Sequence, residues 1–81
     1  MIGYIKGVHV IFGQEYALQN INNDTCYWSD IRDIAWNPPK LYDTNTEEYK
    51  EAISCAATEM LRYPLCWKRI EFVELKPKHL I

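Results

Sequence analysis

The chain is poor in the residues that build disulfide-braced or metal-braced domains. Its 81 residues include three cysteines (Cys26, Cys55 and Cys66) and two histidines, His9 and His79, near opposite ends. Three unevenly spaced cysteines are not the even set that a small secreted domain uses for disulfides. No short Cys or His pair supplies the convergent ligands of a zinc site. We therefore expect reduced cysteines, no metal, no other cofactor and a cytoplasmic location.

A long apolar run and a strong excess of one charge are also missing. No apolar stretch reaches the roughly 18 residues of a membrane span, and Lys6 and His9 interrupt the apolar start where a secretory leader would continue. The formal net charge is −2. A dedicated nucleic-acid binder usually carries a large positive excess, and a charge mimic of duplex DNA needs a much denser negative charge than this. We expect no membrane partner, and direct nucleic-acid binding is the weaker expectation.

Signals of catalysis are scarce as well. The three glycines, Gly3, Gly7 and Gly13, all come far before the helical segment, so no glycine-rich phosphate loop is present. Cys55 has no base beside it in the sequence, and cysteine nucleophiles need one. The sequence therefore predicts a protein that is not an enzyme.

Apolar and aromatic residues are plentiful, and they predict one compact domain over residues 1–81. Hydrophobic residues make up 48% of the chain and aromatic residues 14%, which suits a short domain that must bury a core. Residues 46–62 carry apolar side chains at helical spacing: Tyr49, Ala52, Ile53, Ala56, Ala57, Met60 and Leu61. Thr44 and Glu47 fit a capping box at the start, and Pro64 ends the helix.

Strands are predicted on both sides of this helix. Four segments are rich in β-branched and aromatic residues: 2–12, 16–21, 25–28 and 66–75. Asn22 to Asp24 is the clearest turn, residues 29–42 form a connection with one helical turn capped by Ser29 or Asp30, and residues 78–81 form a frayed tail. The expected fold is α+β, a small antiparallel or mixed sheet of three to four strands packed on one amphipathic helix, in strands–helix–strand order.

The two faces of this sheet are expected to differ. Alternation places apolar residues against the helix, among them Leu18, Tyr27, Ile70 and Phe72. The opposite face is expected to carry Gln19, Trp28, Trp67 and Arg69. A mixture of aromatic and polar side chains on that face is typical of a contact surface as much as of a solvated one.

The order of these signals resembles a group of small bacteriophage proteins, some of them anti-CRISPR inhibitors. The residues that carry the resemblance are Tyr16 to Asn20, Tyr27 to Ser29, Leu41 to Thr44 with Glu47 and Glu48, and Ile70 to Leu75. The resemblance implies a phage-encoded protein in the host cytoplasm. It also implies that the protein binds stoichiometrically to a host protein or ribonucleoprotein complex that serves defence or nucleic-acid processing. Binding would inhibit that complex by occluding one of its sites.

The expected contact residues are acidic, with one tryptophan. A basic partner would be met by an acidic surface, and an aromatic residue in a proline-braced loop is a natural interface anchor. The six residues are Asp30, Asp33, Trp36, Glu47, Glu48 and Glu51. Two alternatives stay open: a nucleic-acid-binding module that uses Trp67, Lys68 and Arg69, and a structural or assembly protein that self-associates through a free strand edge or sheet face, with a dimer as one form.

Overall fold

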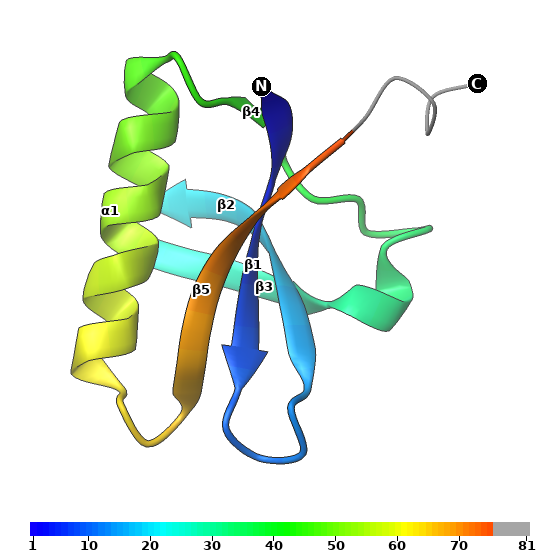
Figure 1. Cartoon of the computed structure of the whole chain (residues 1–81), viewed down its shortest axis with the longest axis vertical. Coiled ribbons are helices and arrows are strands. Elements are labelled where there is room, and N and C mark those ends of the chain that lie inside the picture. Colours follow the sequence, from blue (N-terminus) through cyan, green and yellow to red (C-terminus); the bar gives the residue numbers. More distant parts are fainter. Residues whose placement is uncertain (76–81) are drawn as a thin grey trace.

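A computed structural model describes residues 1–75 and confirms the α+β class (Figure 1). Within these residues, five antiparallel strands form one sheet, and a single long helix packs on one of its faces. The elements in chain order are β1 (Ile2–His9), β2 (Glu15–Asn22), β3 (Thr25–Asp30), the 3-10 turn η1 (Ile31–Asp33), β4 (Tyr42–Asp43), α1 (Glu47–Arg62) and β5 (Trp67–Glu74). The tail expected at 78–81 lies outside the described residues.

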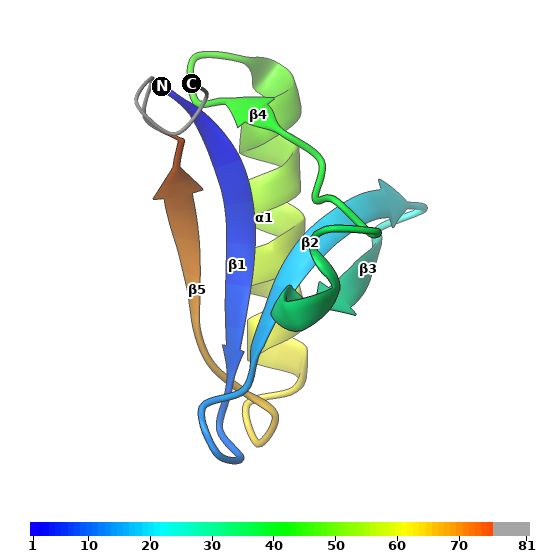
Figure 2. The ribbon, with the colours of Figure 1, turned by 90° about the vertical axis from the view of Figure 1, so that its right-hand side faces the viewer.

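β1 is the centre of the sheet. Along one edge it pairs with β5 over most of its length, from Gly3 to His9. Its other edge is shared, because β2 pairs with residues 6–8 and the short β4 pairs with residues 2–3. Beyond Ala17, β2 has left β1 and pairs with β3 alone, so the two form a ribbon that projects from the sheet (Figure 2).

The two tight connections between strands both use left-handed backbone. Asn23 and Asp24, with φ of 50° and 63°, form the β2–β3 turn that was expected from their side chains. The β1–β2 connection has Phe12 at φ 58° and Gly13 at φ 62°. Glycine adopts this conformation freely, whereas a phenylalanine there is uncommon.

The helix begins and ends as expected, but its cap is different. Thr46 is the N-cap, and its Oγ1 accepts a hydrogen bond from the backbone N–H of Tyr49 at 3.2 Å. The expected capping box from Thr44 is wrong, because Asp43 accepts from the Asn45 N–H and holds residues 43–45 in a turn. Glu47 is consequently the first helical residue and is too early to close the box.

The apolar stripe of α1 is wider than the surface it covers. Ala52 and Ala56 are buried, and Tyr49, Ile53 and Met60 are half-buried. Ala57 and Leu61, which were expected in the core, are exposed, with Leu61 at 78%. Leu61 lies about 160° around the helix from the centre of the buried Ala52–Ala56 face, so it points away from the sheet, and nothing among residues 1–75 covers it.

The sheet faces differ from the expectation at both tryptophans. Trp28 pairs with Leu18, which is fully buried on the helix side, so Trp28 also lies on that side. Trp67 also lies there, 4.8 Å from Trp28 between ring centroids. Tyr27, expected to face inward, is exposed. A register shift between Leu18 and Asn20 accounts for Tyr27 and Trp28, and a second shift at Val8 and His9 in the β1–β5 pair accounts for Trp67, because one extra residue reverses the alternation.

The main core lies between α1 and the sheet. Its fully buried members are Ile5, Leu18, Tyr42, Ala52 and Ala56. On the opposite face, the connection between β3 and β4 passes in front of β2 (Figure 2), and Lys40 N–H donates to the Leu18 carbonyl at 3.4 Å. α1 and this connection therefore lie on opposite sides of the sheet.

Candidate functional site

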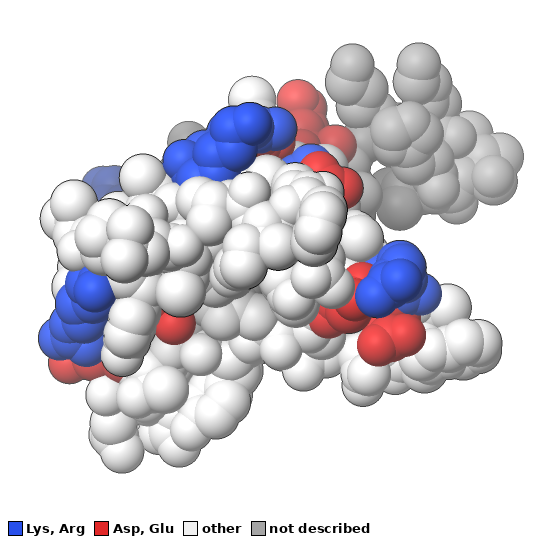
Figure 3. Space-filling model, turned by 90° about the horizontal axis from the view of Figure 1, so that it is seen from below, with Lys and Arg blue, Asp and Glu red and all other residues white. Residues whose placement is uncertain are grey.

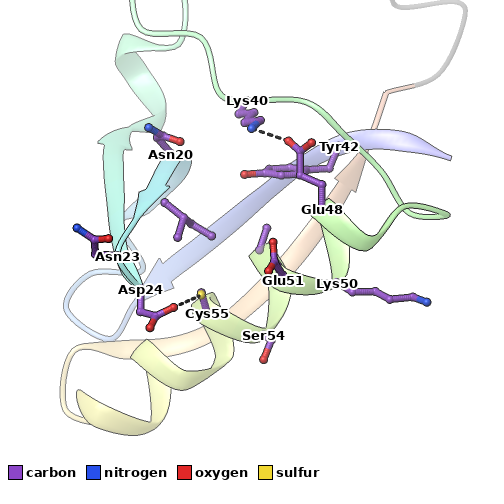
Figure 4. A pocket seen from close by; sticks show the side chains of 12 residues that line it. Asn20, Asn23, Asp24, Lys40, Tyr42, Glu48, Lys50, Glu51, Ser54 and Cys55 are labelled. Atoms are coloured by element: carbon purple, nitrogen blue, oxygen red, sulfur yellow. Dashed lines mark hydrogen bonds and ion pairs between the residues drawn. The ribbon is translucent and has the colours of Figure 1, made fainter.

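A polar groove opens where the β2–β3 ribbon leaves β1. It has a volume of about 620 Å³ and runs between the first half of α1, the tip of the ribbon and Lys40 (Figure 4). Ile21, Tyr42 and Ala52 supply apolar surface. Polar and charged side chains supply the rest: Asn20, Asn23, Asp24, Lys40, Glu48, Lys50, Glu51, Ser54 and Cys55.

Charges in this polar groove are largely paired with one another. Lys40 Nζ lies 2.5 Å from Glu48 Oε1 and 5.4 Å from the Tyr42 ring centroid. The hydrogen bond to Glu48 raises the pKa of Lys40. At the other end of the groove, the Cys55 thiol donates to Asp24 Oδ1 at 3.7 Å. The polar groove is thus a preformed surface with few uncompensated charges to attract a ligand.

The six expected contact residues fall into two separate groups. Glu48 and Glu51 line the polar groove, and Glu47 pairs with Lys50 at 3.2 Å. Asp30, Asp33 and Trp36 lie at η1 and just after it, on the opposite side of the sheet from α1 (Figure 2). One continuous contact surface from all six is therefore not formed.

The η1 group is itself partly neutralised. Asp30 accepts from the Arg32 backbone N–H at 2.9 Å and pairs with the Arg32 guanidinium at 2.7 Å. These bonds hold the pKa of Asp30 far below its usual range. Trp36, by contrast, is exposed. It remains available as an aromatic anchor on that side.

Four aromatic rings form a cluster near one end of the sheet, on the helix side. His9, Tyr16, Trp28 and Trp67 stack edge-on or tilted, with centroids 4.8–6.4 Å apart. Trp28 Nε1–H donates to Glu59 Oε2 of α1 at 2.7 Å. Trp67 is packed among these rings, so it is not a free platform on which nucleic-acid bases would stack.

The turns at this end of the molecule form an exposed apolar surface, which we call the apolar end. Its members are Val10, Ile11, Phe12, Tyr63 and Leu65. The β1–β2 connection and the α1–β5 turn lie side by side, joined by a bond from Val10 N–H to the Cys66 carbonyl at 2.9 Å. The Phe12 side chain is as accessible as in an extended chain, at 101%. Seen from this side, charged side chains lie mostly at the margins of an uncharged surface (Figure 3).

The charged side chains within the two segments that build this end are cationic, while carboxylates of neighbouring segments, such as Asp30 beside Gln14 and Glu59 near Tyr63, also border it (Figure 3). Residues 8–14 and 60–70, which form the apolar end and its surroundings, contain Arg62, Lys68 and Arg69 and no Asp or Glu. Arg69 is paired with Glu71. Within residues 1–75, Arg62 and Lys68 form no ion pair. The apolar residues Val10, Ile11 and Phe12 are visible in the sequence, but the sequence pattern assigns them to the end of a strand.

The chemistry of the cysteines is unfavourable to nucleophilic catalysis. Burial, with a hydrogen bond to Glu59, raises the pKa of Cys26 to about 12. Burial and Asp24 raise the pKa of Cys55. Both thiols stay protonated at neutral pH, whereas the thiolate is the nucleophile. Among residues 1–75, no group of three or more His, Cys, Asp or Glu side chains is placed to hold a metal ion.

None of the helices within residues 1–75 has the length and apolar character needed to cross a membrane. Comparison with protein-family models, curated proteins and solved structures gives no match to this chain. The resemblance to anti-CRISPR inhibitors therefore stays a prediction. The function is argued below from the surfaces alone.

Proposed function

We propose that this chain is a non-enzymatic binding protein that attaches to a partner protein through its apolar end and occludes a site there. The observation that carries the proposal is the pair of adjoining turns with Phe12 and Leu65 almost fully accessible. A soluble domain rarely exposes large apolar side chains side by side unless they meet a partner. Phe12 and Tyr63 are aromatic, the kind of residue that dominates binding energy at interfaces.

Backbone strain at Phe12 supports the same assignment. A left-handed conformation costs about 1–2 kcal/mol for a residue with a Cβ atom. The Phe12 ring has no compensating contact in the core, because it is fully exposed. Strain of this kind concentrates at functional sites, where a side chain is held ready for a ligand. Here the strain presents the ring at the tip of the β1–β2 connection.

The charges around the apolar end indicate the chemistry of the partner. Arg62 and Lys68 form no ion pair among the described residues and are close in sequence to the exposed Tyr63 and Leu65, and Arg62 also lines a small pocket with Asp24 and Glu59. A complementary site has an apolar pocket for Phe12 with carboxylates at its rim. This partner differs from the basic one expected from the acidic residues alone.

A narrower form of the proposal is that the chain is a phage inhibitor of a host defence or nucleic-acid-processing complex. That form rests on the resemblance of the sequence pattern. In it, Glu47, Glu48 and Glu51 are a second contact. Reversing all three charges together would weaken binding and leave folding intact, and an unchanged affinity would remove this second contact.

The experiment begins with capture of partners from a bacterial lysate on the immobilised chain and their identification by mass spectrometry. Each captured protein is then purified and titrated calorimetrically against the chain. We expect one-to-one binding, and a loss of roughly 30-fold in affinity for the double variant Phe12→Ser/Leu65→Ser, as for interface hot spots. Leu41→Ser is the matched control, since Leu41 is exposed away from the apolar end.

Two results would contradict the proposal. One is a captured partner whose affinity is the same for the wild type and for Phe12→Ser/Leu65→Ser. The other is binding of the chain alone to phosphatidylserine vesicles with the same dependence on Phe12 and Leu65. Vesicle binding would assign the apolar end and its cations to an anionic lipid surface.

A further inference from the structure

The outer edge of β5 is open. β5 (Trp67–Glu74) pairs with β1 along one edge, and no other described strand pairs with it. Figure 2 shows β5 at the outside of the sheet with β1 beside it. An edge of eight residues is long for a natural protein to leave uncovered, because its backbone groups are free to pair with another chain.

The backbone groups available at this edge follow from the pairing with β1. Leu75 N–H donates to the Ile2 carbonyl at 2.8 Å, so this antiparallel pair is one that exchanges hydrogen bonds. Such pairs alternate along a ladder with pairs that do not. The residues that point their N–H and C=O groups away from β1 are therefore Ile70, Phe72 and Glu74.

A second copy of β5 fits this edge with complementary charges. Arg69 and Glu71 already pair within each chain, so the contact between chains extends an existing ion pair into a network rather than pairing free charges. When Ile70 of one chain pairs with Ile70 of the other, the residues on either side also pair, so Arg69 lies opposite Glu71 of the second chain. A two-fold axis repeats the contact, so each Arg69 meets a Glu71. In this register the Arg69–Glu71 pairs do not exchange backbone hydrogen bonds, and such pairs bring their side chains closest together. Both side chains are on the face of the sheet opposite α1.

Other antiparallel registers are less favourable. Shifting the axis by one residue to Glu71 places the two Glu71 side chains directly opposite one another, and like charges there are destabilising. Shifting it to Phe72 pairs Glu71 with Val73 and shortens the ladder. Centring on Ile70 uses residues 67–73 in full, which is most of β5.

The helix supplies an apolar surface beside the same edge. Tyr49 of α1 packs against Phe72 of β5 at 5.3 Å, while Glu59 faces Trp28 on the β3 side. Each step of four residues turns 40° around a helix, so Ala57 and Leu61 lie about 120° and 160° from the centre of the buried Ala52–Ala56 face and point away from the sheet. The apolar surface beside this edge is therefore that of Tyr49, Ile53 and Met60, which are half-buried.

We propose that two copies of this chain associate through antiparallel pairing of their β5 edges, with Ile70 at the two-fold axis and Arg69 opposite Glu71. The pairing continues the sheet through both chains. The paired residues, 67–73, include none of the apolar-end residues, so the two proposals are tested by different variants.

The experiment is sedimentation equilibrium over a wide concentration range. We expect the wild type to approach twice the 9.6 kDa mass of one chain. Arg69→Glu and Glu71→Arg, each alone, place like charges opposite one another and weaken the dimer at least about tenfold. An equimolar mixture of the two variants restores opposite charges at every contact and dimerises like the wild type.

Arg32→Glu is the matched control, because it makes the same charge change on η1, away from β5. Circular dichroism checks that each variant is folded. A wild type that stays at 9.6 kDa at its highest soluble concentration overturns the proposal. So does a dimer that both β5 variants leave intact, a mixture that does not recover, or a dimer lost in Phe12→Ser/Leu65→Ser, which would place the contact at the apolar end.

Discussion

The polar groove borders the first half of α1 and the apolar end follows its last turn, and the two differ in how their charges are used. In the polar groove, Lys40 has Glu48 within 2.5 Å and Lys50 has Glu47 within 3.2 Å. At the apolar end, Arg62 and Lys68 have no carboxylate partner among residues 1–75. In the polar groove both lysines are paired, while Glu51 and Asp24 have no cationic partner among residues 1–75; at the apolar end neither Arg62 nor Lys68 is paired.

This difference shows why a count of charges is a poor guide to a contact surface. The acidic residues dominate the composition around the helix start, yet several are already bonded within the chain. A paired surface charge must lose its present partner before it can bind a new one, so its net gain is small. The apolar end has fewer charges, but its cations Arg62 and Lys68 are unpaired within the described part of the chain and its apolar side chains are exposed.

The largest expected effect is a loss of stability when alanine replaces Gly3 or Gly7, two glycines of β1. A Cβ at Gly3, beside β4, would lie 2.0 Å from the Val73 backbone oxygen, and one at Gly7, beneath the aromatic cluster, would lie 2.6 Å from the Trp67 ring. A backbone oxygen in a ladder cannot move aside, whereas a ring can shift. We expect Gly3→Ala to cost about 3 kcal/mol and Gly7→Ala about 1–2 kcal/mol of unfolding free energy.

Urea unfolding of both variants measures this ranking. Gly13→Ala is the control, since its Cβ meets nothing within 4 Å and only its positive φ is unfavourable, at about 1 kcal/mol. Equal losses for Gly3→Ala and Gly7→Ala would mean that the aromatic cluster is as rigid as the β1–β5 ladder.

The next effect concerns the bond that ties the aromatic cluster to α1. Trp28→Phe keeps most of the ring packing but removes the Nε1–H that donates to Glu59. A hydrogen bond to a charged group contributes about 1.5–3 kcal/mol, and the lower end applies because this site is half-buried. Glu59→Gln keeps an acceptor oxygen and should lose less. If thermal or urea unfolding shows that Glu59→Gln loses more stability than Trp28→Phe, the role given to this bond is wrong.

A smaller effect, of opposite sign, is expected at the tip of the apolar end. Asparagine tolerates left-handed backbone better than phenylalanine does. Phe12→Asn should therefore raise the unfolding free energy by about 1 kcal/mol, since the ring has no packing to lose. The same substitution should lower partner affinity, the exchange of stability for activity that is common at functional sites. A loss of stability in Phe12→Asn would show that the ring packs in solution.

The fold was predictable from the sequence because its strongest signals are local. The helical spacing from Tyr49 to Met60 and the Asn23–Asp24 turn each depend on neighbouring residues, and both are confirmed. The sheet faces were not predictable to the same degree. One register shift in β2 reverses the alternation that a simple pattern assumes, and this moved Trp28 to the helix side.

The candidate surfaces were harder still to predict, because they depend on which segments meet in space. The Val10–Cys66 bond joins turns that are far apart in the sequence, and no local pattern announces it. Exposure of Leu61 likewise depends on which face of the helix meets the sheet, a face centred on Ala52 and Ala56. The acidic residues were visible in the sequence, but their partners Lys40 and Arg32 became clear only in three dimensions.

The smallest expected effect is a pH dependence at Cys26, which lies between the two regions and shares Glu59 with Trp28. Burial and Glu59 raise its pKa from 9.0 to about 12 in the folded chain. Between these values the unfolded chain loses the thiol proton while the folded chain keeps it. The unfolded state then binds fewer protons, so stability falls as pH rises above 9.

Comparison with Cys26→Ala isolates this contribution, because the lysines and tyrosines titrate in both proteins. In urea unfolding, we expect the wild type to lose stability relative to Cys26→Ala between pH 8 and pH 10. The size of this loss is set by the raised pKa of the Cys26 thiol. A constant difference for Cys26→Ala across this range would mean that the Cys26 thiol reaches water, and that β3 and α1 are less closely packed at Glu59 than the bond to Trp28 implies.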